Sequence, residues 1–189
     1  MAETIPIVES PPFDFSIKAY HKMIESGIIK PTDKVELIEG QIITMSPINS
    51  PHAACVRRLG SLLRRKLTDS VMISEQNPIS LGTHSEPEPD IALLRFQEDF
   101  YEEAHPTEKD VFVAIEVSHT TQRYDRETKM PLYAQYNIPE AWVVDLVAKT
   151  IEVYAQPVNG KYTDKQTFKR TQVLTSQFVD RLLVSSVVR

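Results

Sequence analysis

Two carboxylates interrupt stretches of sequence that otherwise favour buried β-strands. Glu116 lies inside the apolar run "VFVAIEVS" (111–118), and Asp90 follows Pro89 at the start of "PDIALLR" (89–95). Burial of an unpaired carboxylate is costly, so such a group takes up a proton, pairs with a cation or binds a metal ion. If the two strands are neighbours, Asp90 and Glu116 can converge on one cation.

Two convergent carboxylates suit Mg²⁺ (or Mn²⁺). Mg²⁺ takes one or two protein carboxylates and leaves its other positions to water and phosphate oxygens. Such an ion can generate a nucleophilic water and stabilise negative charge on a phosphate. The alternative is that Asp90 is a turn residue and that Glu116 pairs with an arginine. The presence of both carboxylates in successive predicted strands favours the metal.

The alternation of side chains along a strand predicts which residues accompany Glu116. Successive side chains point to opposite faces of a sheet. We therefore expect Glu116 on one face with Phe112, Ala114 and Ser118, and the valines and isoleucine of the run on the other (Val111, Val113, Ile115, Val117).

The elements that precede these strands are two helices and a hairpin. "FSIKAYHKMIESG" (15–27) predicts a helix that Ser16 caps. "KVELIEGQIITMS" (34–46) alternates on both sides of Glu39-Gly40, which predicts a β-hairpin. "SPHAACVRRLGSLLRRKL" (50–67) has an apolar stripe and a proline in its first turn, which predicts an amphipathic helix.

The remaining elements are predicted as strands at 71–75, 89–95 and 111–118, a helix from about Lys129, and strands at 141–146, 150–155 and 161–168. The central order αβββαβ predicts an α/β fold, an α+β mixed sheet preceded by the N-terminal helix and hairpin. We expect one domain over residues 1–189, with 1–12 as a loose N-terminal arm and the acidic segment 96–110 as a loop.

Composition and charge narrow the possible functions. The net charge of -5 argues mildly against a nucleic-acid partner, although bases are concentrated at 52–70, ahead of an acidic stretch at 75–116. Cys55 is the only cysteine, which excludes an intrachain disulfide and a cysteine-based zinc cluster; we expect it in the core. The chain shows no membrane-length apolar run and no signal peptide, so a cytoplasmic protein without a membrane partner is expected.

Several motifs resemble a known family. "PD" at 89–90 followed by "EVS" at 116–118 resembles the PD-(D/E)XK nuclease signature. More narrowly, segments between about 34 and 155 resemble, in order, the Uma-two family of bacterial restriction-endonuclease-like proteins ("ELIEGQIITMSP", "PHAACVRRL", "EPEPDIALLR", "IEVSHTTQRYDRETKMPLYAQYNIPEAWVVDL", "IEVYA"). The resemblance implies a restriction-endonuclease-like fold and divalent-metal-dependent hydrolysis of DNA phosphodiester bonds. A homodimer is also expected, because enzymes that cut both strands commonly pair two sites.

The PD-(D/E)XK signature has a lysine at the position of Ser118. Lys129, at the start of the next predicted helix, matches the family position of a displaced lysine, so we expect it to reach back and assist the water or the phosphate. The resemblance also suggests Glu36 as an accessory acid and His52 as a contact to phosphate or water. Without the resemblance, all three residues would be read as surface or capping residues.

The neighbours of these residues are assigned supporting roles. Asp125 and Arg126 are expected to fix, through local pairing, the turn that delivers Lys129. Core and rim packing is expected of the aromatic residues that follow (Tyr133, Tyr136, Trp142). The helix at 50–67 offers four arginines for the DNA backbone (Arg57, Arg58, Arg64, Arg65).

Two other functions remain open. A nuclease-fold protein that has lost catalysis could serve as a binding or regulatory module, and Ser118 together with the net acidity speaks for it. A zinc-dependent hydrolase could instead use His52, Asp90 and Glu116 as ligands.

Overall fold

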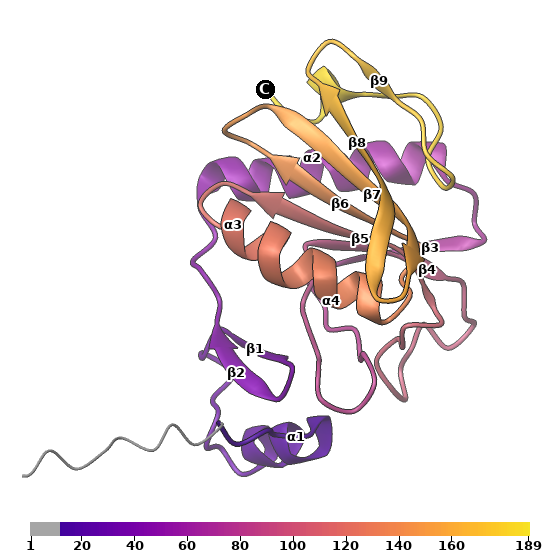
Figure 1. The fold of residues 1–189 in the computed structure, drawn as a ribbon. Coiled ribbons are helices and arrows are strands. Elements are labelled where there is room, and N and C mark those ends of the chain that lie inside the picture. The colour runs from indigo at the N-terminus through magenta and orange to yellow at the C-terminus, as the bar shows by residue number, and fades with distance from the viewer. Residues whose placement is uncertain (1–11) are drawn as a thin grey trace, which may run out of the picture.

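The computed structural model describes residues 12–189, so the N-terminal arm predicted at 1–12 lies outside the described residues except for Pro12. A six-stranded sheet in the order β3-β4-β5-β6-β7-β8 forms the centre of the molecule (Figure 1). Its strands are β3 (Val71–Glu75), β4 (Ile91–Arg95), β5 (Val111–Ser118), β6 (Glu140–Asp145), β7 (Thr150–Val158) and β8 (Lys161–Lys169). The mixed α/β class and the αβββαβ order of the core are confirmed.

β5 and β6 pair in parallel, whereas the other neighbouring strands of the sheet pair antiparallel. A parallel pair needs a crossover connection, and three consecutive helical segments provide it. They are α3 (Gln122–Tyr124), a π-helix (Asp125–Lys129) and α4 (Met130–Gln135). The helical backbone thus begins at Gln122, so the prediction of a start near Lys129 was wrong. Proline clashes in a regular helix interior, and the wider π-helix directly before Pro131 accommodates it.

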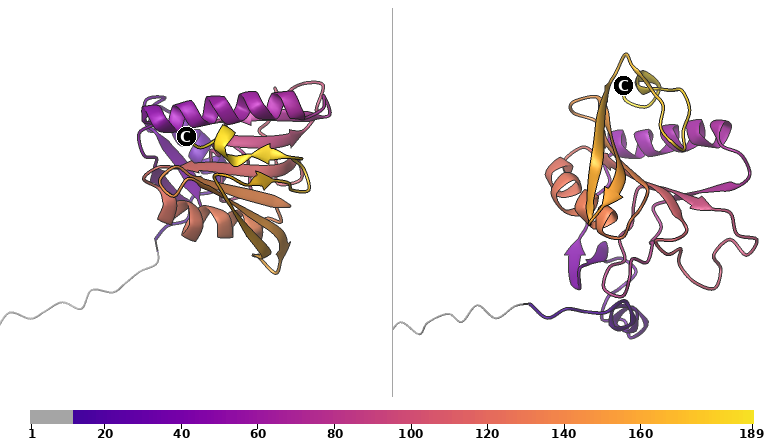
Figure 2. Two further views of the ribbon diagram at one scale, coloured as in Figure 1. Left: turned by 90° about the horizontal axis from the view of Figure 1, so that it is seen from above. Right: turned by 45° about the vertical axis from the view of Figure 1, so that its right-hand side comes forward.

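Helices cover both faces of the sheet, as Figure 2 shows from above. On one face, α2 (Ser50–Lys66) packs Cys55, Leu59 and Leu63 against alternate residues of β5 (Val113, Ile115, Val117). The C-terminal residues Val184, Val187 and Val188 join the same cluster. On the other face, Met130 and Tyr133 from the crossover pack with Ala114, Ala141 and Val143. The burial of Cys55 confirms its predicted place in the core.

A β-bulge at the start of β5 changes the face of the sheet on which its first two side chains lie. Leu93 pairs with Val113 and Leu94 with Val111, so Phe112 is an extra residue in its strand. Val111 therefore packs on the α4 side, while Phe112 lies on the α2 side and stacks on Phe178 with ring centroids 5.4 Å apart. The predicted alternation holds from Val113 to Val117 and was wrong for Val111 and Phe112.

The N-terminal elements lie together at the lower end of the view in Figure 1. α1 (Ile17–Glu25) is capped by the predicted Ser16, whose side chain accepts the N–H of Ala19. The predicted hairpin is formed by β1 (Val35–Ile38) and β2 (Gln41–Thr44). It is joined to the loop that precedes β4 by a bridge between Leu37 and Glu86.

Short elements complete the chain: β9 (Val173–Leu174), β10 (Leu182–Leu183) and a 3₁₀ helix (Val184–Ser186). The acidic segment 96–110 contains neither helix nor strand, as predicted. Within residues 12–189, no helix has both the length and the apolar character needed to cross a membrane.

Candidate active site

A cleft of about 1050 Å³ lies between the hairpin, the first turn of α2, the start of β4, the end of β5 and the crossover helix. All five residues predicted for catalysis line it: Glu36, His52, Asp90, Glu116 and Lys129. Acidic side chains outnumber basic ones in the lining, which favours the binding of a cation.

Asp90 directly precedes β4 and lies level with Glu116, one position beyond the last Cα pair of the two antiparallel strands. Its Oδ2 accepts the backbone N–H of Val117 at 2.8 Å, and Nε2 of His52 lies 2.9 Å away. Among the described residues, the one hydrogen bond to its Oδ1 is a long contact of 3.4 Å from Gln76 Nε2. The carboxylate is thus held from one side and retains an oxygen with spare capacity to bind a ligand.

Glu116 is a buried carboxylate with an exposed fraction of only 5%. Its Oε1 accepts a hydrogen bond from the Tyr133 hydroxyl at 2.5 Å and lies 3.6 Å from Lys129 Nζ. Within residues 12–189, no hydrogen bond is made to its Oε2. Burial raises the pKa of Glu116 well above its usual range, against the opposing effect of the Lys129 charge. The ionised form of this carboxylate would therefore gain from a further positive charge.

Lys129 ends the π-helix and is buried between two carboxylates. Its ammonium forms ion pairs with Oε2 of Glu36 and with Oε1 of Glu116. Burial disfavours the ammonium, but the charges of Glu116 and Glu36 outweigh it and raise the pKa of Lys129 above its usual range. Lys129 therefore remains protonated near neutral pH and can act as a fixed positive charge.

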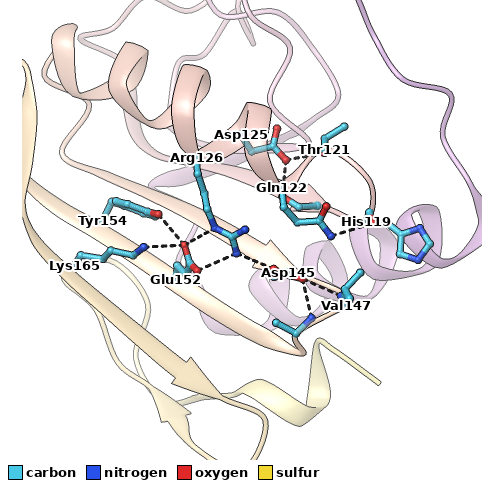
Figure 3. A network of polar contacts seen from close by, with 12 residues as sticks. His119, Thr121, Gln122, Asp125, Arg126, Asp145, Val147, Glu152, Tyr154 and Lys165 are labelled. Carbon is cyan, nitrogen blue, oxygen red and sulfur yellow. Dashed lines mark hydrogen bonds and ion pairs between the residues drawn. The ribbon is translucent and has the colours of Figure 1, made fainter.

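The π-helix that carries Lys129 is anchored by two neighbouring residues that leave the helix in different directions (Figure 3). Asp125 Oδ2 accepts hydrogen bonds from Ser118 Oγ at 2.5 Å and from Thr121 Oγ1 at 2.7 Å. The other anchor, Arg126, donates to Asp145 of β6 at 2.7 Å and to Glu152 of β7 at 3.1 and 3.0 Å. Pairing with residues nearby in the sequence was thus predicted correctly for Asp125. The prediction was wrong for Arg126, whose partners lie 19 and 26 positions away.

Glu36, which was expected to be an accessory acid, lines the wall of the cleft. It is buried, and its Oε2 accepts the N–H of Glu88 at 3.2 Å in addition to the Lys129 ammonium. Its Oε1 accepts the Tyr124 hydroxyl at 3.2 Å. These hydrogen bonds hold Lys129 and the wall of the cleft in place. The burial of Glu36 excludes the alternative that it is an exposed hairpin residue.

His52 lies in the first turn of α2, where Asn49 caps the helix by accepting the His52 N–H at 3.1 Å. Burial lowers the pKa of His52, but the hydrogen bond and the charge of Asp90 outweigh this and raise it above the usual value. Its Nδ1 is buried and has no hydrogen-bond partner among the described residues. His52 thus braces Asp90 and keeps one ring nitrogen unbonded.

The four arginines proposed to grip DNA do not line the cleft. Arg57 is exposed on α2. The other three are engaged elsewhere: Arg58 with the carbonyl of Val187 at 2.9 Å, Arg64 with Glu75 at 2.8 Å, and Arg65 with Ser61 at 2.9 Å. Their contact with DNA stays a prediction.

The cleft offers oxygen ligands of the kind that a hard divalent cation prefers. Asp90 and Glu116 offer carboxylate oxygens, as Mg²⁺ and Mn²⁺ prefer. His52, Asp90 and Glu116 do not form a group whose ligand atoms all lie within 4.8 Å of one another. This arrangement fits a cation completed by water and does not favour a zinc site made by His52, Asp90 and Glu116.

Two contacts of the site were missed from sequence. Tyr133 was predicted as packing, and it is fully buried, yet its hydroxyl also donates to Glu116. Its spacing of four residues from Lys129 puts both on one helix face, which is a signal that could have found it. The role of Ser118 as a donor to Asp125 was not foreseen either, because the two residues lie seven positions apart across a turn and the start of a helix.

The chain is similar to known proteins in family and in fold. A comparison with curated proteins finds no match. The fold is similar to that of a crystal structure described as a putative nuclease belonging to DUF820 from Anabaena variabilis, with a TM-score of 0.70, 15% identity, and coverage of 92% of this chain and 97% of that chain. The family model Uma2, described as "Putative restriction endonuclease", matches residues 17–184. The resemblance noted in the sequence is thereby confirmed, and the chain belongs to the Uma2 (Uma-two) family.

Proposed function

We propose that the protein is an endonuclease that hydrolyses phosphodiester bonds of DNA with the help of Mg²⁺ or Mn²⁺ bound by Asp90 and Glu116. The family supports a restriction-endonuclease-like nuclease. The observation that carries the proposal is the pair of carboxylates, level with each other on adjacent strands and open to one cleft that also holds Lys129.

The residues of the cleft would have different roles in such a reaction. When bound, the divalent cation supplies positive charge to the phosphate and lowers the pKa of water. Asp90 and Glu116 hold it, and Tyr133 orients Glu116 by its hydrogen bond. Lys129 is held protonated, so its role is to stabilise negative charge on the phosphate or to orient water, and it does not act as the base.

The charge of the cleft predicts how DNA binds. Carboxylates repel a phosphate backbone, and the basic residues Lys34 and Arg123 also line the cavity. Both are exposed, so they can meet a backbone at the edge of the cleft. Productive binding of DNA should therefore need the divalent cation to neutralise the cleft.

The decisive experiment compares tag-free wild-type protein with Asp90→Asn and Glu116→Gln on supercoiled plasmid, with Mg²⁺, Mn²⁺ or EDTA. We expect nicking or linearisation by the wild type with either metal, none with EDTA, and a loss of at least ~100-fold in each variant. Asp180→Asn, an exposed acid that does not line the cleft, is the matched control and should cut like the wild type.

The outcomes separate the competing functions. Equal cleavage by wild type and Asp90→Asn would identify a contaminating nuclease and refute the proposal. Metal-dependent DNA binding without any cleavage would favour a nuclease-fold module that has lost catalysis. Cleavage that needs Zn²⁺ and is abolished by His52→Ala would instead favour the zinc hydrolase.

A further inference from the structure

A second group of possible metal ligands lies outside the cleft. His21 of α1, Glu86 of the loop before β4 and His105 of the acidic segment each bring one ligand atom within 4.8 Å of the other two. Nε2 of His21 lies 2.8 Å from Oε1 of Glu86, and the rings of His21 and His105 have centroids 6.2 Å apart. Segments remote in sequence thus place two imidazoles around one buried carboxylate.

Each ligand belongs to a segment that backbone hydrogen bonds hold in place. Glu86 exchanges backbone hydrogen bonds with Leu37 of β1, at 2.7 and 3.4 Å. The residue after His105 is tied to the same region, because the carbonyl of Pro106 accepts the N–H of Ser80 at 2.8 Å. The group is therefore built into the fold, although His105 itself is exposed.

The surroundings of Glu86 are those of a metal-binding carboxylate. Its exposed fraction is only 3%, and its second oxygen accepts a hydrogen bond from Ser80 Oγ at 3.1 Å. Such a bond to the second oxygen orients a carboxylate toward the ligand held by the first. A cavity of about 320 Å³ adjoins the three side chains and leaves room for water or another ligand in a fourth position.

We propose that His21, Glu86 and His105 form a second metal site, which binds a borderline divalent cation such as Zn²⁺. Two imidazoles and one carboxylate are a common donor set for zinc with an open fourth position, whereas Mg²⁺ prefers oxygen ligands alone. The bound ion would tie α1 and the acidic segment to the loop that leads into the cleft. That loop continues to Glu88, which lines both cavities.

The test is the zinc content of tag-free protein that has been stripped with a chelator, loaded with ZnCl₂ and dialysed. We expect about one zinc per chain in the wild type and little or none in His21→Ala and His105→Ala. Both substitutions are at exposed or half-exposed side chains, so the variants should fold. The matched control is His84→Ala, an exposed histidine outside the group, which should retain zinc.

Two further measurements make the test decisive. Zinc should raise the melting temperature of the wild type and of Asp90→Asn, but not that of His105→Ala, because a ligand stabilises only a protein that binds it. The proposal is overturned if the wild type takes up no zinc or if His105→Ala retains it. It is also overturned if zinc is lost from Asp90→Asn and kept by His105→Ala, which would place the ion in the cleft.

Discussion

The hydroxyl of Ser118 donates a 2.5 Å hydrogen bond to Oδ2 of Asp125 and so connects the end of β5 to the start of the π-helix. Ser118 occupies the position where the PD-(D/E)XK signature has its lysine. Lys129 lies four positions after Asp125, at the opposite end of the π-helix, and supplies an ammonium beside Glu116. The serine thus helps to hold the helix whose last residue provides the positive charge.

Ser118→Ala should lower the free energy of unfolding by about 1–2 kcal/mol, because it leaves the buried Asp125 carboxylate with Thr121 as its remaining side-chain donor. Cleavage should fall by less than in Lys129→Met, since the ammonium itself remains. Urea denaturation and plasmid nicking measure the two effects. Ser61→Ala is the control: it removes only the exposed hydrogen bond from Arg65 on α2 and should change the free energy of unfolding by less than about 0.5 kcal/mol. An unchanged stability of Ser118→Ala would show that the short contact does not anchor the helix.

Lys129→Met should leave two buried carboxylates, Glu36 and Glu116, without their shared cation. We expect a loss of about 3 kcal/mol in the free energy of unfolding and of at least ~100-fold in the cleavage rate. The double variant Lys129→Met/Glu36→Gln removes one charge of each sign and should regain much of the stability without regaining cleavage. Denaturation and nicking assays give the two quantities.

Lys34→Met is the control for that experiment, because Lys34 is an exposed cation that lines the same cleft. It should keep the stability of the wild type and lose only a small part of its DNA binding. Cleavage by the stable double variant at the wild-type rate would contradict a catalytic role for Lys129.

The elements of the fold were predictable where their signals are local. The hairpin is an example: Glu39 and Gly40 both have positive φ, at 46° and 76°, as a tight two-residue turn between strands requires. The bulge at Phe112 and the π-helix were not predictable. An extra residue in a strand depends on its partner β4, and a π-helix is a rare single-turn feature within an α-helical segment.

The site was predictable to a similar degree. Asp90 and Glu116 stand out because each is a carboxylate in an apolar strand. The ion pair of Lys129 with Glu36 joins residues 93 positions apart, which no local pattern reveals. The family resemblance pointed to both residues but not to the contact between them. The single domain, the homodimer and the contacts of the α2 arginines with DNA stay predictions.

Tyr133→Phe should weaken Mn²⁺ binding by about tenfold, because the substitution removes the hydroxyl that orients Glu116 and keeps the buried ring. Mn²⁺ titration followed by electron paramagnetic resonance measures the affinity. Tyr162→Phe is a matched control: its hydroxyl donates to the carbonyl of Ile138 at 2.9 Å, away from the cleft. It should lose about 1 kcal/mol of stability without any change in Mn²⁺ affinity. Equal effects of both variants on the affinity would assign Tyr133 to packing alone.

The network around Arg126 predicts how stability depends on pH (Figure 3). Burial raises the pKa of Asp145, but the N–H of Ala148 and the Arg126 guanidinium outweigh it and lower the pKa below the usual 3.8. Burial also raises the pKa of Glu152, but hydrogen bonds from Arg126, Tyr154 and Lys165 outweigh this effect and lower the pKa below the usual 4.5. A carboxylate with a lowered pKa in the folded state stabilises the protein above its unfolded pKa, and this stabilisation is lost as the pH falls through the folded pKa.

Arg126→Met should therefore be less stable than the wild type by about 2 kcal/mol at pH 7, because two largely buried carboxylates lose their shared donor. The difference in the free energy of unfolding between wild type and variant should narrow as the pH falls below 4.5, because these carboxylates begin to take up protons in the unfolded chain there. Urea denaturation at a series of pH values measures it. The control is Arg123→Met, whose ion pair with Glu127 is exposed, and this variant should have the stability of the wild type at each pH. A difference that stays constant down to about pH 3 would mean that Arg126 stabilises the helix by packing and not through its two carboxylates.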